Sequence, residues 1–196
     1  MNTITAIENR RSTRKFSGND IDQNTIRNIL KAGINAPSPK NNQPWKFFVI
    51  KESKQQLIKV IEKGIEDIKS SFGLLLDAKN FLYSAETTLK IMKDAPVIIF
   101  VINTENKQDY GKTLVKKYVE MANILSIGAA VENMLLASHE YGIGSLWIGD
   151  IYYTVREIGE WLQTDRQIAA AIALGYPDED PSPKKRKELN ELVEWK

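Results

Sequence analysis

The fold is constrained most by four short apolar segments, because stretches with helical periodicity separate them along the chain. The segments are residues 45–50, 96–102, 144–148 and 167–174, and each has the length of a strand. Strands separated by helices predict a mixed α/β layer arrangement. The chain has 196 residues, enough for one sizeable core, and no Gly/Ser-rich or Pro-rich tract divides it. A single domain over residues 1–196 is therefore expected.

Several helical patterns have recognisable ends. Thr5 and Glu8 have the spacing of a capping box, which predicts a helix that begins near Thr5. Asp22 precedes an apolar pattern that ends before Pro37, so Asp22 is expected to cap a second helix. Further helices are predicted over residues 53–68, 72–92, 116–141 and 154–162.

The longest predicted helix, residues 116–141, carries one face of apolar and small side chains at three- and four-residue spacing. Such a face is typical of a helix that packs against other elements. Its members are Tyr118, Met121, Leu125, Gly128, Val131, Leu135 and Ser138.

Composition excludes several classes of function. The chain has 27 Lys and Arg against 25 Asp and Glu, a formal charge of +2, which is too small for a general polyanion binder. It has no cysteine, which excludes disulfides, thiolate catalysis and Cys-ligated metal centres. Met1 leads into a helical pattern without a signal-like apolar core, and the apolar run at residues 95–102 is too short to cross a bilayer. A cytoplasmic protein is expected.

A polar loop at residues 36–45 carries three prolines between a helical pattern and a strand pattern. Its hydroxyl and amide side chains both donate and accept hydrogen bonds, while the prolines restrict the backbone around them. This combination suits the binding of a flat polar heterocycle. An ordinary turn remains the alternative, since Pro and Asn are common turn residues.

Basic residues cluster near both ends of the chain, at residues 10–15 and 184–187. Guanidinium groups bind phosphate oxygens in bidentate fashion, and the two clusters could converge on one anion. Each could also be a solvated surface or a nucleic-acid contact. The tail continues into the apolar Leu189, Leu192 and Trp195, which are expected to cover this domain or that of a partner.

Other signatures of nucleotide or metal chemistry are incomplete. The glycines at positions 142 and 144 begin a dinucleotide-binding pattern, but Trp147 occupies the third glycine position. The single histidine, His139, is expected to be a surface or satisfied core residue rather than a catalytic one.

Four motifs together resemble the nitroreductase family of FMN-dependent oxidoreductases. They are Arg10-Arg-Ser-Thr-Arg14, Ala36-Pro-Ser-Pro-Lys-Asn-Asn-Gln-Pro-Trp45, Gly142-Ile-Gly-Ser-Leu-Trp-Ile-Gly149, and Gly175-Tyr-Pro177 followed by Lys184 and Arg186. Their order and spacing match the family across nearly the whole chain. The resemblance implies an α+β, three-layer fold with a mixed central sheet flanked by helices. It also implies a homodimer that binds FMN at its interface and exchanges its C-terminal tails.

The resemblance assigns cofactor-binding roles to residues in all four motifs. The FMN phosphate and ribityl chain would contact Arg10, Ser12, Lys184 and Arg186, with charge or backbone contributed by Arg11. Arg14 would lie near the N1 and O2 edge of the flavin, where a cation favours reduction. The other subunit would contribute Pro37, Ser38, Pro39 and Asn41, and the ring would face the backbone of Trp147, Ile148 and Gly149. Pro39 departs from the family pattern and removes a backbone donor.

The implied reaction is hydride transfer from NADH or NADPH to FMN and then to a nitroaromatic, quinone or similar acceptor. No side chain need act as acid or base, so no catalytic residue is predicted. With a single His and no Cys, no metal site is predicted either. Reductive dehalogenation, flavin cleavage and flavin storage are alternatives on related scaffolds. A small nucleic-acid-binding module that uses the two basic clusters is the alternative outside flavoproteins.

Overall fold

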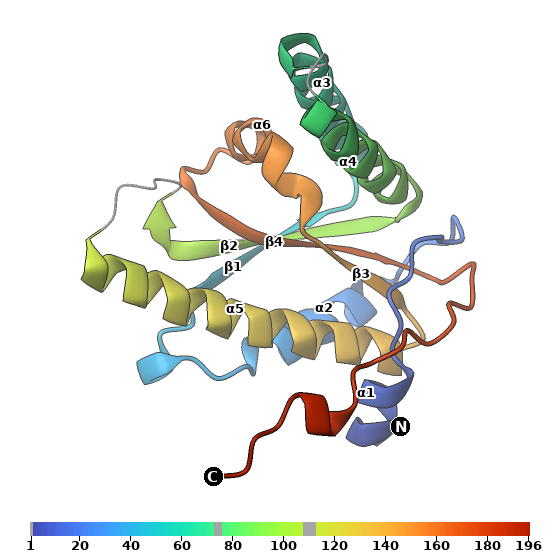
Figure 1. Ribbon diagram of the computed structural model, residues 1–196. Coiled ribbons are helices and arrows are strands. Elements are labelled where there is room, and N and C mark those ends of the chain that lie inside the picture. The colour runs from blue at the N-terminus through green and yellow to red at the C-terminus, as the bar shows by residue number, and fades with distance from the viewer. Residues whose placement is uncertain (1, 73–75, 108–112) are drawn as a thin grey trace.

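A four-stranded antiparallel sheet lies at the centre of the computed structural model, which describes residues 2–72, 76–107 and 113–196 (Figure 1). The strand order is β1-β2-β4-β3. The strands are β1 (Trp45–Ile50), β2 (Val97–Lys107), β3 (Gly144–Ile148) and β4 (Arg166–Gly175). The structure confirms the α+β fold and all four predicted strand positions, and β2 and β4 extend beyond the expected ends.

The prediction of a mixed sheet is wrong for these four strands. A single helix connects β2 to β3, and those two strands do run in the same direction, as such a connection predicts. However, β4 lies between them and pairs antiparallel with both. Parallel pairing among the described residues is limited to one isolated bridge between Ser12 and Ser145.

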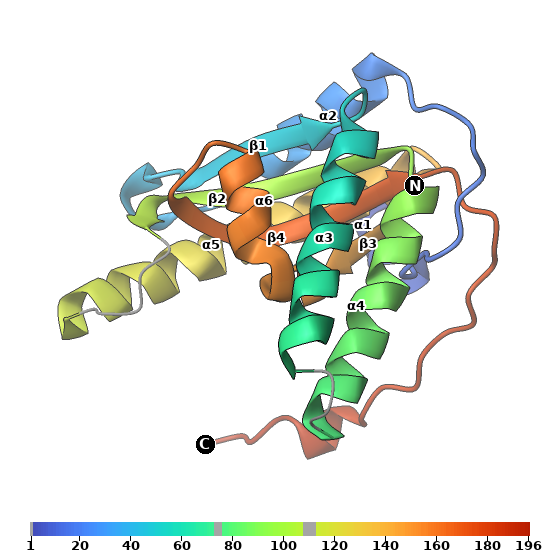
Figure 2. The ribbon, with the colours of Figure 1, turned by 90° about the horizontal axis from the view of Figure 1, so that it is seen from above.

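Helices cover both faces of the sheet and make three layers (Figures 1 and 2). One face packs against α3 (Lys54–Phe72), α4 (Leu76–Asp94) and α6 (Val155–Trp161), and the other against α2 (Gln23–Ile34) and α5 (Leu114–Glu140). The short α1 (Thr3–Asn9) lies beside the C-terminal half of α5. Residues 73–75, within the predicted helix 72–92, lie outside the described residues.

Strand β2 shows why the apolar runs are continuous rather than alternating. Ile98, Phe100 and Ile102 face the core shared with α3, α4 and α6. Val97, Ile99 and Val101 face the core shared with α2 and α5. All six are at most 1% exposed, because a central strand covered on both faces must be apolar on both.

The helix starts match the sequence predictions unequally. Asp22 caps α2 as predicted, and its Oδ1 accepts hydrogen bonds from the backbone N–H groups of Asn24 and Thr25 at 2.9 and 3.0 Å. The capping box at Thr5 and Glu8 is wrong. The N-cap of α1 is Asn2, whose Oδ1 accepts from the Thr5 N–H at 2.9 Å, so Thr5 lies inside the helix.

Helix α5 has two halves with different surroundings. Toward its C-terminus, Val131, Leu135 and Ser138 of the predicted face are buried. Toward its N-terminus the same face is exposed: Tyr118 by 60%, Met121 by 54% and Leu125 by 69%. The neighbouring apolar residues are exposed to a similar degree, namely Leu114, Val115 and Val119. In Figures 1 and 2 this half extends beyond the sheet. By length and composition alone α5 could cross a membrane, but it is in part a core helix.

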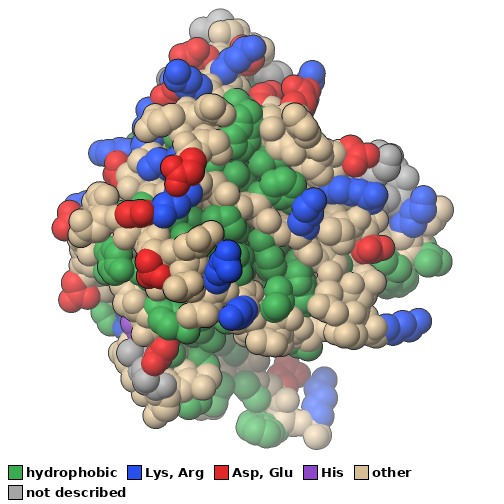
Figure 3. Space-filling model, turned by 180° about the vertical axis from the view of Figure 1, so that it is seen from behind, with side chains coloured by type: hydrophobic (Ala, Val, Ile, Leu, Met, Phe, Trp, Pro, Cys, Tyr) green, Lys and Arg blue, Asp and Glu red, His purple; other side chains and the backbone are tan. Residues whose placement is uncertain are grey.

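The C-terminal tail leaves the sheet and runs past α1 as an extended chain (Figure 1). The short 3-10 helix η3 (Leu189–Glu191) interrupts it. Leu189, Leu192 and Trp195 are 69%, 64% and 90% exposed, so the tail does not cover its own domain. Seen from behind in Figure 3, hydrophobic side chains form a band through the middle of the molecule with charged groups around it.

Candidate cofactor site

The N-terminal arm, residues 10–14, lies along the outer edge of β3. The Thr13 N–H donates to the Ser145 carbonyl at 3.0 Å, next to the bridge between Ser12 and Ser145. Gly144 permits this close approach, because a Cβ there would lie 2.8 Å from Thr13 Cγ2 and Oγ1. The arm is therefore fixed beside the edge strand.

The start of the tail is fixed to the same arm. The Asp178 N–H donates to the Lys15 carbonyl at 3.0 Å, and Ser17 N–H donates to the Tyr176 carbonyl at 2.9 Å. Glu179 Oε1 accepts from the backbone N–H groups of Arg14 and Lys15. These bonds place the following residues of the tail next to the arm.

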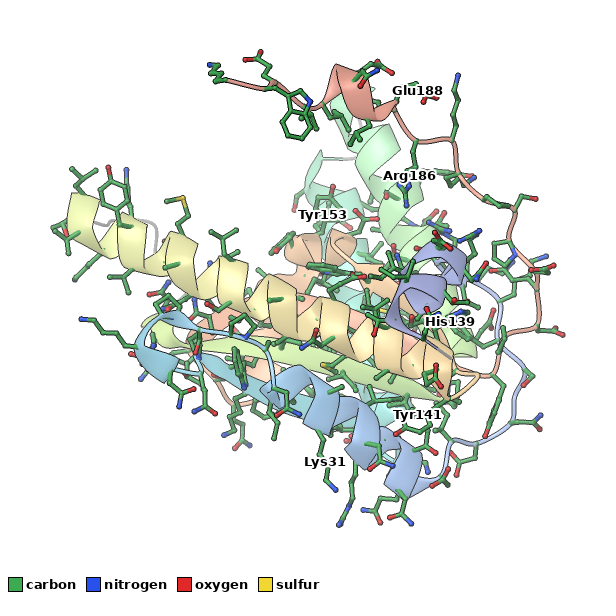
Figure 4. The ribbon with its side chains drawn as sticks, turned by 90° about the horizontal axis from the view of Figure 1, so that it is seen from below. Lys31, His139, Tyr141, Tyr153, Arg186 and Glu188 are labelled. Carbon is green, nitrogen blue, oxygen red and sulfur yellow. The ribbon has the colours of Figure 1, made fainter. Side chains whose placement is uncertain are left out.

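The arm and the tail together line an open cavity of about 370 Å³, named here the basic cavity. It brings together six of the sequence-predicted site residues, which come from opposite ends of the chain: Arg10, Arg11, Ser12, Arg14, Lys184 and Arg186. Figure 4 shows Arg186 extending from the tail toward α1. The two basic clusters therefore lie side by side in this cavity, and their binding of one anion stays a prediction.

The cations of the basic cavity have few internal partners. Arg10 Nε lies 3.8 Å from Glu132 Oε1, and the Arg11 guanidinium donates to backbone carbonyls. Lys184 and Arg186 make no ion pair with any other described residue. Five cations against the single carboxylate of Glu8 give the cavity a positive potential, which favours an anion.

A second cavity of about 260 Å³, named here the β3 cavity, shares the lining residue Arg14 with the first. Its floor includes the predicted residues Trp147, Ile148 and Gly149. Since the Ser145 carbonyl points away from β4, the backbone N–H of Trp147, two residues along the strand, points the same way. An unpaired amide edge therefore faces this cavity.

The loop with Pro37, Ser38, Pro39 and Asn41 lies elsewhere. It lines neither cavity of its own subunit, and in Figure 1 it lies below the far end of the sheet from α1 and the tail. The loop is ordered by a 2.9 Å hydrogen bond from the Gln43 N–H to Ser38 Oγ.

Three residues of this loop have a positive φ without being glycine. They are Lys40, Asn41 and Gln43, with φ values of 54°, 55° and 48°. Residues other than glycine adopt this conformation at a cost, and such strain concentrates at binding sites. The loop geometry therefore supports a binding role, although not within the same subunit.

Helix α4 contributes site residues for which the sequence showed no motif. Tyr83, Ser84, Thr87, Thr88 and Ile91 line the β3 cavity, together with Asp150 from the 3-10 helix η2 (Asp150–Thr154). The only available signal was the spacing of the hydroxyl residues, which recur after four positions and so share one helix face.

His139 lies outside both cavities. Its Nε2 is buried without a hydrogen-bond partner, and the residue lines a separate hollow of about 230 Å³ behind the arm. The residue as a whole is half-buried and lines neither the basic cavity nor the β3 cavity.

Relatives and solved structures are similar to this chain over most of its length. An iodotyrosine deiodinase of Thermotoga neapolitana is 28% identical over 186 residues, which are 89% of this chain and 88% of that protein. The structure of a BluB-like flavoprotein from Clostridium difficile 630 superposes with a TM-score of 0.84 at 27% identity and covers 100% of this chain and 99% of its own.

A third similarity is to a structure from Desulfovibrio desulfuricans described as a nitroreductase in complex with FMN. It is 29% identical, has a TM-score of 0.72 and covers 99% of this chain and 96% of its own. The sequence model of the nitroreductase family matches residues 7–176. This match includes the arm, the loop and β3 and ends at Tyr176, and the chain belongs to the nitroreductase family.

Proposed function

We propose that this protein is an FMN-dependent NAD(P)H oxidoreductase that passes electrons to a small organic acceptor. The observation that carries the proposal is that Arg14 lines both the basic cavity and the β3 cavity, which contains the amide edge of β3. One end of this space suits a phosphate, and the other suits a flat ring with hydrogen-bonding edges. FMN has both groups, and the Desulfovibrio relative is described with FMN bound.

The phosphate end is formed by side chains that have few competing partners. Arg10, Lys184 and Arg186 can each donate charge-assisted hydrogen bonds to phosphate oxygens, and the Ser12 hydroxyl can add another. Because the two groups of cations come from the arm and the tail, the phosphate would neutralise repulsion between them.

At the ring end, this chain supplies backbone dipoles rather than an acid or a base. When bound, FMN supplies the hydride chemistry itself. The outward N–H of Trp147 can donate to a ring nitrogen, and Arg14 places a positive charge where the two cavities meet. These groups orient the ring and favour its reduction.

The subunit alone leaves several features without a role, and a second copy accounts for them. The strained loop with Ser38 and Asn41 lies apart from the site, the N-terminal half of α5 is apolar and exposed, and Trp195 covers nothing. A homodimer in which the loop and tail of each subunit reach the other would bury these groups at the FMN site.

The reductant would be NADH or NADPH, which would stack on the ring, since the chain has no dinucleotide-binding fingerprint. Nitroaromatics and quinones are the proposed acceptors. Reductive dehalogenation is the second candidate, because one relative of nearly equal length is named iodotyrosine deiodinase. Anaerobic assays with a nitroaromatic, a quinone and an iodophenol would distinguish these reactions.

The direct test is to measure FMN in the purified protein. One FMN per subunit is expected, and the yellow colour should bleach anaerobically with NADH or NADPH. Arg10→Ala and Arg186→Ala should each weaken FMN binding by about 1–3 kcal/mol, because each removes a charged phosphate contact.

Arg156→Ala is the matched control. Arg156 is an exposed arginine on α6 that pairs with Glu160 and lines neither cavity. FMN affinity should be unchanged in this variant. A protein that cannot be loaded with FMN contradicts the proposal. If Arg10→Ala and Arg186→Ala bind FMN as tightly as the control Arg156→Ala, the assignment of the phosphate end is contradicted.

A further inference from the structure

A polar contact joins α4 to the turn that follows β3. Asp150 follows Gly149 directly, and its Oδ2 accepts a hydrogen bond from Ser84 Oγ at 2.7 Å and from Thr88 Oγ1 at 3.2 Å. Thr88 is 9% exposed, while Ser84 and Asp150 are half-buried, so the contact is partly shielded from water. Shielded polar groups are costly when unpaired, which favours keeping this contact closed.

The contact lies in the lining of the β3 cavity, to which all three residues belong. Asp150 continues the floor formed by residues 146–149, while Ser84 and Thr88 belong to the helical wall that also contains Tyr83, Thr87 and Ile91. The distance between floor and wall sets the width of the cavity. Any acceptor that lies against the ring must fit within that width.

The other described polar contacts of α4 lead to α3 instead. Lys93 pairs with Glu62 at 2.6 Å, Glu86 pairs with Lys69, and Lys54 Nζ donates to the Lys93 carbonyl at 2.8 Å. These contacts hold α3 and α4 together as a pair. Asp150 connects the pair to the β3 turn through Ser84 and Thr88.

We propose that Asp150 is a positioning residue that sets which acceptors the enzyme takes. By holding α4 against the β3 turn, it keeps the β3 cavity narrow and favours compact, single-ring acceptors over larger ones. The proposal rests on the function proposed above, since it assumes that the acceptor enters the β3 cavity.

The test replaces the donors and leaves Asp150 in place. Ser84→Ala/Thr88→Val removes both hydroxyls with little change in volume. The FMN-loaded enzyme is assayed with 1,4-benzoquinone and with the two-ring quinone menadione. The ratio of the KM for menadione to the KM for benzoquinone should fall about five-fold, in line with the loss of a shielded hydrogen bond. The change should lie in KM more than in kcat.

Two variants separate positioning from the polarity of the wall. Thr87→Val also removes a hydroxyl from the cavity, but that hydroxyl donates to the Tyr83 carbonyl at 2.8 Å and not to Asp150. Its KM ratio should stay close to that of the wild type. Asp150→Asn keeps an oxygen that can accept from Ser84 and should also retain the ratio. An equal shift in Thr87→Val, or no shift in the double variant, overturns the proposal.

A measurement without FMN tests the contact itself. In Ser84→Ala/Thr88→Val, the backbone amides of α4 should exchange hydrogen faster than in the wild type, while those of β4 should not change. Unchanged exchange in α4 overturns the positioning role. If the wild type binds no FMN but the α4 amides exchange faster in the variant, the proposed function is contradicted, whereas the role of Asp150 in holding α4 is supported.

Discussion

Asp22 illustrates how one side chain determines where a helix begins. The pKa of its carboxyl is lowered by the hydrogen bond from the Thr25 hydroxyl and by those from the backbone N–H groups of Thr25 and Asn24. A carboxyl with a lowered pKa in the folded state stabilises that state at neutral pH. The contribution is complete above the unfolded pKa of about 4 and is lost as the pH falls through the folded value.

Asp22→Ala should therefore lower the Tm at pH 7 by about 2–4 °C, because α2 loses its N-cap. Asp22→Asn keeps a capping oxygen that does not titrate. This variant should match the wild type near pH 7 and should lose less stability than the wild type below pH 4. Thermal unfolding followed by circular dichroism across this pH range provides the measurement. Parallel curves for Asp22→Asn and the wild type would contradict the role of the charge.

At the scale of single residues, the sequence predicts best where chemistry is local. The Asp22 cap was predictable because its partners follow within three residues. The cap of α1 was assigned to Thr5 because a glutamate follows at the right spacing, whereas Asn2 makes the hydrogen bond. Asp150 carried no local signal, since its partners on α4 lie 62 and 66 positions away.

At the scale of elements, the site depends on the close contact between the arm and β3. A Cβ on Gly144 would lie 2.8–2.9 Å from three atoms of Thr13, which is closer than real Cβ atoms approach. Gly144→Ala must therefore displace the arm, and with it Ser12 and its neighbouring cations. We expect FMN affinity to fall at least about ten-fold, because misplaced cations lose charge-assisted hydrogen bonds.

FMN titration by fluorescence quenching gives the affinity, and the Tm reports the fold. Gly18→Ala is the control, since a Cβ at that position meets nothing within 4 Å. Its affinity should equal that of the wild type. If Gly144→Ala binds FMN as tightly as Gly18→Ala, the arm is not required to lie against β3 for binding.

The strands were predictable because each is a run of buried apolar residues of suitable length, and β1 and β3 have the expected bounds. Their pairing was not, because apolar periodicity contains no information about neighbours. Strands β2 and β3 run in the same direction, but β4 lies between them and pairs antiparallel with both. The sheet is therefore antiparallel where a mixed one was expected.

At the scale of the whole molecule, the residues of the predicted site lie in separate regions of one subunit. The basic cavity and the β3 edge were brought together as expected, but the loop with Ser38 was not. The apolar face of α5 was predictable from spacing, whereas its exposure was not. Burial of Tyr118, Met121 and Leu125 requires a surface that their own chain does not supply.

The dimer hypothesis predicts that one charge on this face separates the subunits and releases FMN. Leu125 is 69% exposed in the N-terminal half of α5, and Leu125→Lys would place a charge in the proposed apolar interface. Tyr141→Lys is the control, because Tyr141 is 47% exposed at the opposite end of the same helix (Figure 4). Sedimentation velocity should show a dimer for the wild type and for Tyr141→Lys.

Leu125→Lys should sediment as a monomer, or as a dimer that dissociates on dilution, and it should bind FMN more weakly although every residue of the basic cavity is retained. Loss of residues 188–196 should weaken the dimer in the same way, since it removes Leu189, Leu192 and Trp195 but leaves Lys184 and Arg186. A monomeric wild type that binds one FMN tightly would contradict this hypothesis. The loop with Ser38 and Asn41 would then have no part in the site, and the basic cavity and the β3 edge would have to hold the cofactor alone.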